Sequence, residues 1–148
     1  MRWLVPPVLG LILALAMAVA ARLLPQPTLL PEPWNAALGW LLIALGLGLM
    51  AAAAWLFRRH RTNIHPFGKP DVLITDGVFR LSRNPIYLGL TLILTGIAFQ
   101  LNVLAALPFA AVFLVVADRW YIPIEEQLAE AAFGVDFDAY RQRVRRWL

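Results

Sequence analysis

The chain has 148 residues, 61% of them hydrophobic and 15% charged, which excludes an ordinary soluble domain, because such domains are about 45–50% apolar. It has no cysteine, so disulfides, thiolate metal sites, iron–sulfur clusters and a cysteine nucleophile are excluded as well. Its net charge of +4 comes from arginines that gather beside apolar runs, a placement that favours membrane topology and anionic-lipid contact over nucleic-acid binding.

Two apolar runs in the first half of the chain match the roughly 20 helical residues that cross a bilayer. Residues 3–24 form the first predicted span, which ends in the proline-rich connector PQPTLLPEP. Residues 34–57 form the second, and we expect it to be central in the bundle, because its many alanines and glycines let helices approach closely in lipid. The basic segment 58–61 follows, so the positive-inside rule places this end in the cytoplasm, and the N-terminus with it.

Two shorter apolar runs, 86–101 and 103–120, are interpreted as a helical hairpin. Gln100 and Asn102 mark its outer tip. Each run is short for a full span, so the hairpin tilts or barely crosses the bilayer. Because a hairpin folds back on itself, its start and its end should be neighbours in space on the cytoplasmic side.

The C-terminal segment 123–148 is predicted to form cytoplasmic helices. IEEQLAEAAFG runs to Gly134, a normal residue after a helix end, and Asp136 can cap a second helix. An apolar stripe with helical spacing, backed by arginines, runs along the second half of the segment 123–148: Phe133, Phe137, Tyr140, Val144 and Trp147. Such a stripe is typical of an interfacial amphipathic helix, which would lie as a lid over the cytoplasmic mouth of the bundle.

These elements predict an all-α fold, a polytopic membrane helical bundle with about four transmembrane helices. We expect one domain, residues 1–148, with a cytoplasmic loop at 62–85, both termini in the cytoplasm and a bacterial-type inner membrane as its location. No obligate protein partner is evident. His60 and His65 are a poor metal pair, because helical ligand pairs favour a spacing of about four, so no metal site is predicted.

Polar residues at the cytoplasmic side carry the candidate chemistry, because charged groups beside a membrane are costly unless paired or solvated. Arg83 and Asn84 precede the hairpin, and Tyr87 lies in its first turn. Glu125 and Glu126 follow it. Taken singly, each has a plain structural explanation: an Asn-Pro pair is a typical helix start, and glutamates suit the first turn of a helix.

Together, these residues describe a pocket with helix-start N–H groups, an arginine, a tyrosine ring and two carboxylates. Such a pocket suits a ligand with both a carboxylate and a cation, as in an amino acid derivative that carries a sulfonium. The glutamates can bind its ammonium and ribose hydroxyls, and helix-start amides or Arg83 its carboxylate. Tyr87, Tyr121 or Phe79 can face the sulfonium through cation–π attraction.

Two motif blocks cover about the last half of the chain, LITDGVFRLSRNPIYLG and EEQLAEAAFGVDFDAYRQRVRRW. The first resembles L-V-x-x-G-x-Y-x-x-x-R-[HN]-P-x-Y-x-G, and the second resembles E-E-x-x-L-x-x-x-F-G-x-x-Y-x-x-Y-x-x-x-V. These are patterns of the integral-membrane methyltransferases that include isoprenylcysteine carboxyl methyltransferase and phosphatidylethanolamine N-methyltransferase. The blocks stand in that family's order, with a hairpin between them.

The resemblance implies S-adenosylmethionine as methyl donor, bound on the cytoplasmic side, and a lipophilic acceptor dissolved in the membrane. The donor-binding residues carried over by position are His65 (or Ile64), Val72, Leu73, Ile74, Phe79, Asn84, Pro85, Ile86, Tyr87 and Glu125. Phe79 stands in place of the usual tyrosine. The candidate catalytic residues are Arg83, Tyr121 and Glu126; Glu126 or a water would take the proton of an amine acceptor, whereas a carboxylate acceptor needs no base.

Two departures from the family pattern leave the acceptor open between an isoprenylcysteine-type carboxylate and a phospholipid amine. Asn84 replaces the histidine of the prenylcysteine enzymes and matches the NPxY form of the phospholipid enzymes. Tyr121 stands where the prenylcysteine enzymes have an arginine, and Arg119 lies two positions earlier. An alternative function is a non-enzymatic small membrane protein that binds anionic lipid or a partner helix, but it leaves the coincidence of the two blocks unexplained.

Overall fold

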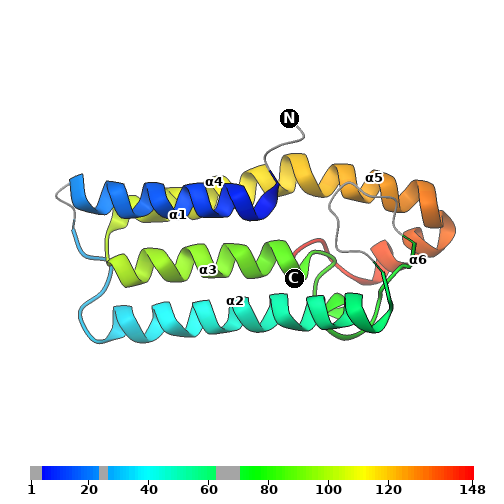
Figure 1. Cartoon of the computed structure of the whole chain (residues 1–148), viewed down its shortest axis with the longest axis horizontal. Helices are drawn as coiled ribbons and strands as arrows, with labels where there is room; N and C mark the ends of the chain where they lie inside the picture. The colour runs from blue at the N-terminus through cyan, green and yellow to red at the C-terminus, as the bar shows by residue number, and fades with distance from the viewer. Residues whose placement is uncertain (1–4, 24–26, 63–70) are drawn as a thin grey trace.

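The computed structural model describes residues 5–23, 27–62 and 71–148. Four helices run along one axis in alternating directions, so that successive helices are antiparallel (Figure 1). They are α1 (Pro6–Leu23), α2 (Trp34–Arg59), α3 (Pro85–Leu101) and α4 (Leu107–Val116). Two more helices, α5 (Ile122–Phe133) and α6 (Val135–Arg143), extend the molecule at the end where α2 stops and α3 begins.

Within the described ranges, three helices are long and apolar enough to cross a membrane: Pro6–Leu23, Trp34–Arg59 and Leu104–Phe133. α3 is apolar but has 17 residues, so at 1.5 Å per residue it covers about 25 Å, less than the roughly 30 Å of a hydrocarbon core. Large apolar side chains on the outer faces are exposed, as at Leu15 (59%) and Leu45 (51%). The predicted all-α membrane bundle is confirmed, and the chain is an integral membrane protein.

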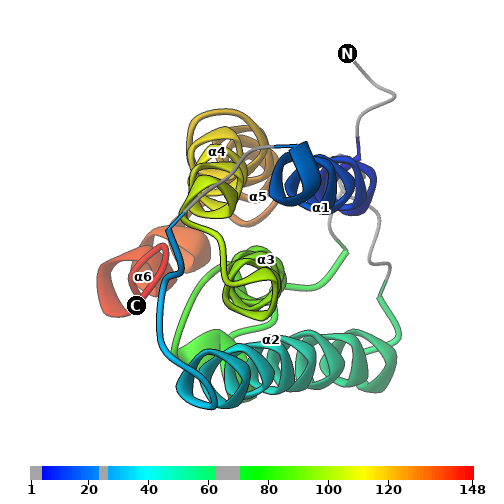
Figure 2. The same ribbon diagram turned by 90° about the vertical axis from the view of Figure 1, so that its left-hand side faces the viewer.

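The central helix is α3, which lies between α2 on one side and α1 and α4 on the other (Figure 2). The prediction that the second span is central is therefore wrong, although the close approach expected of its glycines is present. A Cβ added to Gly46 would lie 2.5 Å from the carbonyl oxygen of Gly89, and one added to Gly96 would lie 2.7 Å from the carbonyl oxygen of Gly39. Glycines on both helices thus let α2 and α3 pack backbone against backbone.

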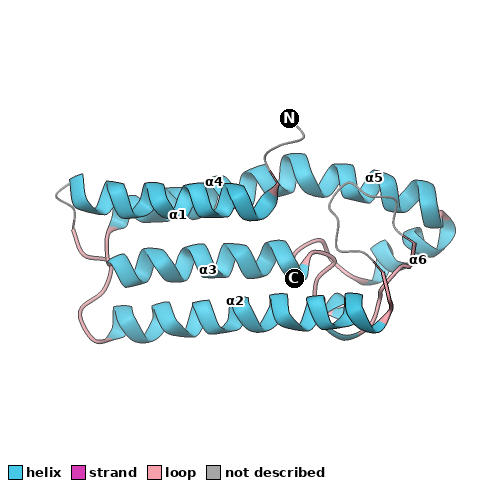
Figure 3. Ribbon diagram, in the orientation of Figure 1, coloured by secondary structure: helices cyan, strands magenta, loops and turns pink. Residues whose placement is uncertain are grey.

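The second helix of the hairpin does not stop near residue 120, which is the predicted end of the span. It passes through a π-helical turn, Ala117–Tyr121, into α5, so that one helix continues from Leu104 to Phe133 (Figure 3). A proline inside a helix removes one backbone hydrogen bond and crowds the carbonyl four residues earlier. The wider π turn directly before Pro123 accommodates that residue, so the helix continues.

The C-terminal apolar stripe packs against other parts of the protein. α6 ends at Arg143, and Val144 is extended (φ −125°, ψ 130°), so the helix that the stripe predicts through Trp147 is interrupted. Phe137 and Tyr140 are buried in a small core that also contains Phe79. The stripe therefore closes the end of the bundle, because the turn Gly77–Arg80 offers it an apolar partner.

The opposite end of the hairpin is fastened by Asn102, which adopts a left-handed backbone conformation (φ 54°) at the end of α3. Its side-chain oxygen accepts hydrogen bonds from the backbone N–H groups of Leu29 (2.9 Å) and Leu30 (3.1 Å). Its side-chain nitrogen donates to the carbonyl of Leu30 (3.0 Å). The hairpin tip is thereby joined to the connector between α1 and α2.

Candidate functional site

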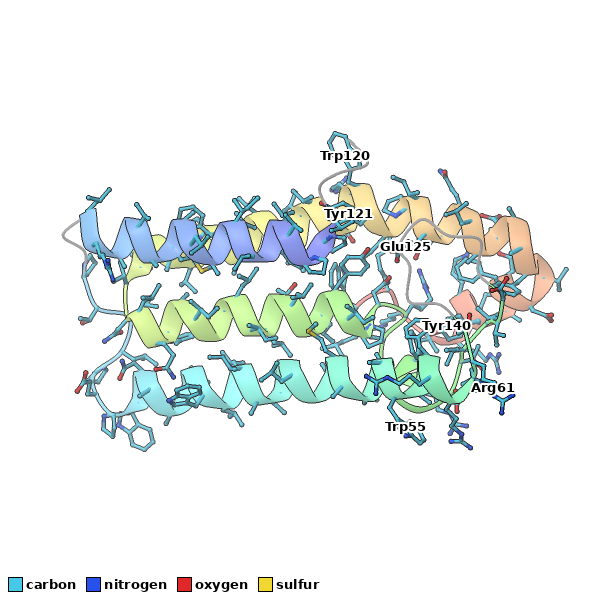
Figure 4. The ribbon with its side chains drawn as sticks, in the orientation of Figure 1. Trp55, Arg61, Trp120, Tyr121, Glu125 and Tyr140 are labelled. Carbon is cyan, nitrogen blue, oxygen red and sulfur yellow. The ribbon has the colours of Figure 1, made fainter. Side chains whose placement is uncertain are left out.

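The candidate site lies where α3 begins beside α5. Figure 4 shows Glu125 on the side of α5 that faces the rest of the molecule, whereas Trp120 projects away from it. The hydroxyl of Tyr87 donates a hydrogen bond of 2.6 Å to Oε1 of Glu125. This contact joins the two motif blocks and confirms that the start and the end of the hairpin are neighbours.

Two tyrosine rings lie beside this carboxylate. The ring of Tyr121 stacks on that of Tyr87, with centroids 6.1 Å apart and planes 14° from parallel. Both tyrosines are buried, with 5% of Tyr87 and 6% of Tyr121 exposed. Tyr121 ends the π-helical turn, and Glu125 follows one helical turn later, so both side chains reach the start of α3 from the same helix.

The start of α3 is built by the loop before it. Pro85 occupies the first turn, where its missing N–H is not needed. The backbone N–H of Asn84 donates to Oγ of Ser82 (3.1 Å). Asn84 precedes the first residue of α3, but its side chain makes no capping hydrogen bond and donates instead through Nδ2 to the carbonyl of Arg146 (3.0 Å). The side chain of Asn84 thus joins the start of α3 to the C-terminal residues.

Arg83 was a candidate for binding a ligand carboxylate, but its guanidinium is engaged inside the protein. Nη2 donates to Oε1 of Glu126 (2.6 Å). Nη1 donates to the carbonyls of Val144 (2.8 Å) and Arg141 (3.2 Å). The geometry thus gives Arg83 the role of holding α5 and the C-terminal residues at the start of α3.

Glu126 has a second guanidinium partner, Arg146, which the sequence analysis missed. Nη2 of Arg146 donates to Oε2 of Glu126 (2.6 Å), and Nη1 donates to Oδ1 of Asp118 (3.2 Å). The indole N–H of Trp147 donates to the same Asp118 oxygen (3.0 Å). Hydrogen bonding to Glu126 raises the pKa of Arg146 above its ordinary value, so this guanidinium stays charged. No sequence signal distinguishes Arg146 from the other arginines of the tail.

Charge around the site is unevenly distributed. Arg83 and Arg146 balance Glu126 and Asp118, since each arginine pairs with at least one of these carboxylates. The hydrogen-bond partner of Glu125 is the neutral phenol of Tyr87, and no cation pairs with Glu125 among the residues that the structure describes. A carboxylate beside two stacked tyrosine rings is a favourable environment for a cation.

The remaining predicted donor residues lie in different surroundings. Ile74 and Phe79 are buried in the second core, where Leu73 and Ile86 are partly buried against them. Val72 is 39% exposed. His65 and Ile64 fall outside the described residues. Of the predicted donor residues, the structure therefore brings Asn84, Pro85, Tyr87 and Glu125 to one place, together with Tyr121 from the catalytic candidates.

Phe79 is fixed by contacts of its own. Its ring meets that of Phe57 edge to face, with centroids 5.7 Å apart. Its carbonyl accepts a hydrogen bond of 2.7 Å from the hydroxyl of Tyr140. Burial raises the pKa of Tyr140 to about 12, so this hydroxyl remains a donor at any physiological pH. The turn before α3 is thereby tied to α6.

The sequence of this chain is similar to those of known proteins. The chain matches the model of the phospholipid methyltransferase family over residues 34–136, a range that includes α3 and Glu125. The chain belongs to this family. It is also 31% identical over 140 residues to protein-S-isoprenylcysteine O-methyltransferase B of Arabidopsis thaliana, in an alignment that covers 88% of this chain and 70% of the plant protein.

A second relative is an uncharacterized protein of Haemophilus influenzae, 36% identical over 63 residues, which are 43% of this chain and 100% of that protein. No solved structure matches the chain. The family resemblance drawn from the two motif blocks is confirmed. Membership of this family makes the chain a membrane methyltransferase, with the paired blocks at one end of the bundle.

Proposed function

We propose that this membrane methyltransferase uses S-adenosylmethionine as donor and a lipophilic molecule dissolved in the bilayer as acceptor. The observation that carries the proposal is the 2.6 Å hydrogen bond from Tyr87 to Glu125, which unites the two motif blocks. Beside it, the stacked ring of Tyr121 completes a group of two buried aromatic rings and one partly buried carboxylate. This group supports recognition of a cation.

The residues present fit such a donor. S-adenosylmethionine, when bound, supplies a methyl group on a sulfonium, so the donor is already activated. Glu125 attracts the positive charge of the donor or accepts from its hydroxyls, and Tyr87 and Tyr121 offer ring faces to the cation. The backbone N–H groups at the start of α3, which have no partner within the helix, suit a carboxylate. The protein then acts mainly by orienting the reactants and excluding water.

The acceptor class follows from what Glu126 is able to do. Both oxygens of Glu126 accept hydrogen bonds from guanidinium groups, those of Arg83 and Arg146. A carboxylate held in this way is a poor base, because the two cations favour its ionised form. A carboxylate acceptor needs no base, whereas an amine acceptor would be left with water to take its proton, so we favour a lipophilic carboxylate as acceptor. The name of the plant relative, an O-methyltransferase, supports the same choice.

We place the site on the cytoplasmic side of the membrane. Exposed arginines gather at the end of α2 and in the turn before α3, at Arg58, Arg59, Arg61 and Arg80. The positive-inside rule then assigns this end of the bundle, and both termini, to the cytoplasm. A donor entering from the cytoplasm and an acceptor entering from the bilayer would meet at the start of α3.

The donor is tested by calorimetry of the purified protein with S-adenosylmethionine and with its demethylated product, S-adenosylhomocysteine. The acceptor is tested by incubation with membrane extract and a donor carrying a labelled methyl group. Methyl esters release labelled methanol in mild base, whereas methylated amines keep the label. Absence of binding heat with both ligands, together with no labelled lipid, would rule out the proposed function and favour the non-enzymatic alternative.

Tyr87→Phe is expected to weaken binding of S-adenosylhomocysteine about tenfold, because a hydrogen bond to a charged group contributes about 1.5–3 kcal/mol and Glu125 loses the donor that orients it. Tyr140→Phe is the matched control, since it removes a phenol that donates to the carbonyl of Phe79 in the second core. We expect Tyr140→Phe to keep wild-type affinity. Equal affinities for wild-type protein and Tyr87→Phe would show that this hydrogen bond does not contribute to donor binding.

A further inference from the structure

The last residues of the chain lie across the start of α3. We call residues 144–147 the C-terminal strap. Its carbonyl oxygens face the loop before α3: the carbonyl of Arg145 accepts from the backbone N–H of Arg83 (3.1 Å), and that of Arg146 accepts from Oγ of Ser82 (3.1 Å) and Nδ2 of Asn84 (3.0 Å). With the bond from Arg83 to Val144 (2.8 Å), the strap engages each residue from 82 to 84.

Arg146 is the residue of the strap that contacts both walls of the site, which are the start of α3 with the loop before it on one side and α5 on the other. Its carbonyl holds the loop before α3, and its guanidinium holds the helix that carries Glu125, through Glu126 and Asp118. Both ion pairs are partly shielded, with the side chain of Glu126 16% exposed and that of Asp118 29% exposed. Shielding from water makes such charge-assisted hydrogen bonds stronger than those on an open surface.

The two walls need such a connection. Tyr87 lies on α3 and Glu125 on α5, and α5 runs past the start of α3, out to α6 (Figure 1). Beyond that point α5 is held by apolar contacts of Ala129 and Phe133 with the second core and by polar links to the start of α3. Arg83 supplies one link, from the α3 side, and Arg146 supplies another, from the strap.

Arg146 also fixes the two other carboxylates of this helix. The neighbouring Glu126 pairs with two guanidiniums, and loss of Arg146 leaves it held by Arg83 alone. Asp118 would lose its guanidinium partner from the strap at the same time. The helix that carries both glutamates would then be free to turn or shift relative to Tyr87.

We propose that Arg146 is a positioning residue of the donor site, which fixes the α5 wall against the α3 wall and so determines affinity for the methyl donor. The proposal rests on the proposed function, because it concerns the site assigned there. It gives the guanidinium of Arg146 a role in donor binding that the family patterns of the two motif blocks do not indicate.

The test compares Arg146→Ala with Arg145→Ala in the full-length protein. The two variants lose the same charge from neighbouring positions, but the side chain of Arg145 is exposed and makes no ion pair among the residues that the structure describes. We expect Arg146→Ala to weaken binding of S-adenosylhomocysteine and to raise KM for the donor about tenfold, with kcat changed less than about twofold, since the change removes positioning and no reacting group. Arg145→Ala should match wild-type protein in all three quantities.

Arg146→Lys supplies a further readout that general destabilisation would not produce. Lysine keeps the charge but cannot bridge two carboxylates with a planar fork, so its donor affinity should fall between those of wild-type protein and Arg146→Ala. If Arg146→Ala fails to fold, Asp118→Asn takes its place, with an expected loss of about threefold in donor affinity from one weakened ion pair.

The outcomes are distinguishable. Wild-type protein that binds no donor would overturn the proposed function. Wild-type protein that binds, with Arg146→Ala or its substitute binding equally well, would overturn the role of Arg146 alone. A loss confined to kcat, or an equal loss in Arg145→Ala, would also overturn that role.

Discussion

Glu125→Gln is expected to weaken binding of S-adenosylmethionine at least about a hundredfold, equivalent to about 2.7 kcal/mol, and to reduce methyl transfer further. Glutamine has nearly the same shape and keeps an oxygen that can accept from Tyr87, so the change removes the charge and little else. The magnitude reflects the burial of the two tyrosine rings, because a charge in a poorly solvated site interacts more strongly with a ligand than one in water. Calorimetry with S-adenosylmethionine and transfer of a labelled methyl group measure the two effects.

Glu130→Gln is the matched control for this variant. Glu130 lies further along α5, is exposed, and makes no ion pair among the described residues, so its loss of charge should leave affinity and turnover unchanged. A reduction shared by both variants would point to a general effect of acidic charge. Wild-type affinity in Glu125→Gln would show that this carboxylate does not take part in donor binding.

Gly46→Ala is expected to destabilise the protein by about 3 kcal/mol, the upper end of the usual range for overpacking. The added Cβ would lie 2.5 Å from the carbonyl oxygen of Gly89 and 2.7 Å from the side chain of Ile93, and a backbone carbonyl cannot move aside as a side-chain tip can. α3 would have to shift as a whole. Because the site begins at the first turn of α3, we expect methyl transfer to fall together with the thermal midpoint of unfolding in detergent.

Gly48→Ala is the internal comparison, two positions along the same helix. A Cβ at Gly48 meets no heavy atom within 4 Å, so alanine should be neutral or stabilise the helix by up to about 1 kcal/mol. Gly89→Ala should reproduce the damage from the other side, since its Cβ would lie 2.7 Å from the carbonyl oxygen of Gly46. Equal thermal midpoints for Gly46→Ala and Gly48→Ala would contradict the close packing of α2 and α3.

The helical segments follow closely from local properties of the chain. The apolar runs 3–24, 34–57 and 86–101 correspond to α1, α2 and α3 within a few residues, because the length of an apolar run and its polar flanks limit a membrane helix. The end of the fourth helix does not follow in this way. The polar residues near 120 suggest a break, but a π turn absorbs Pro123 and the helix continues to Phe133.

The packing order of the helices depends on matches between distant residues. Glycines in the second span indicate a close helix contact, yet the partner and the register are properties of two helices together. Gly46 meets Gly89 and Gly39 meets Gly96, and α3 also contacts α1 and α4, so α3 is the central helix. The sequence pattern of one helix does not show which residues of another helix it will contact.

For the site, the sequence by itself determined the identity of the two motif blocks and their meeting across a short hairpin, and the structure then showed that Tyr87 contacts Glu125 there. Only the tertiary structure decided how the charges are shared. It engages Arg83 with Glu126, recruits Arg146 from the tail, and leaves Glu125 without a cation among the described residues. The physical reason is that an ion pair depends on distance and shielding in three dimensions, and arginines and glutamates of equal local character become distinct only when the chain has folded.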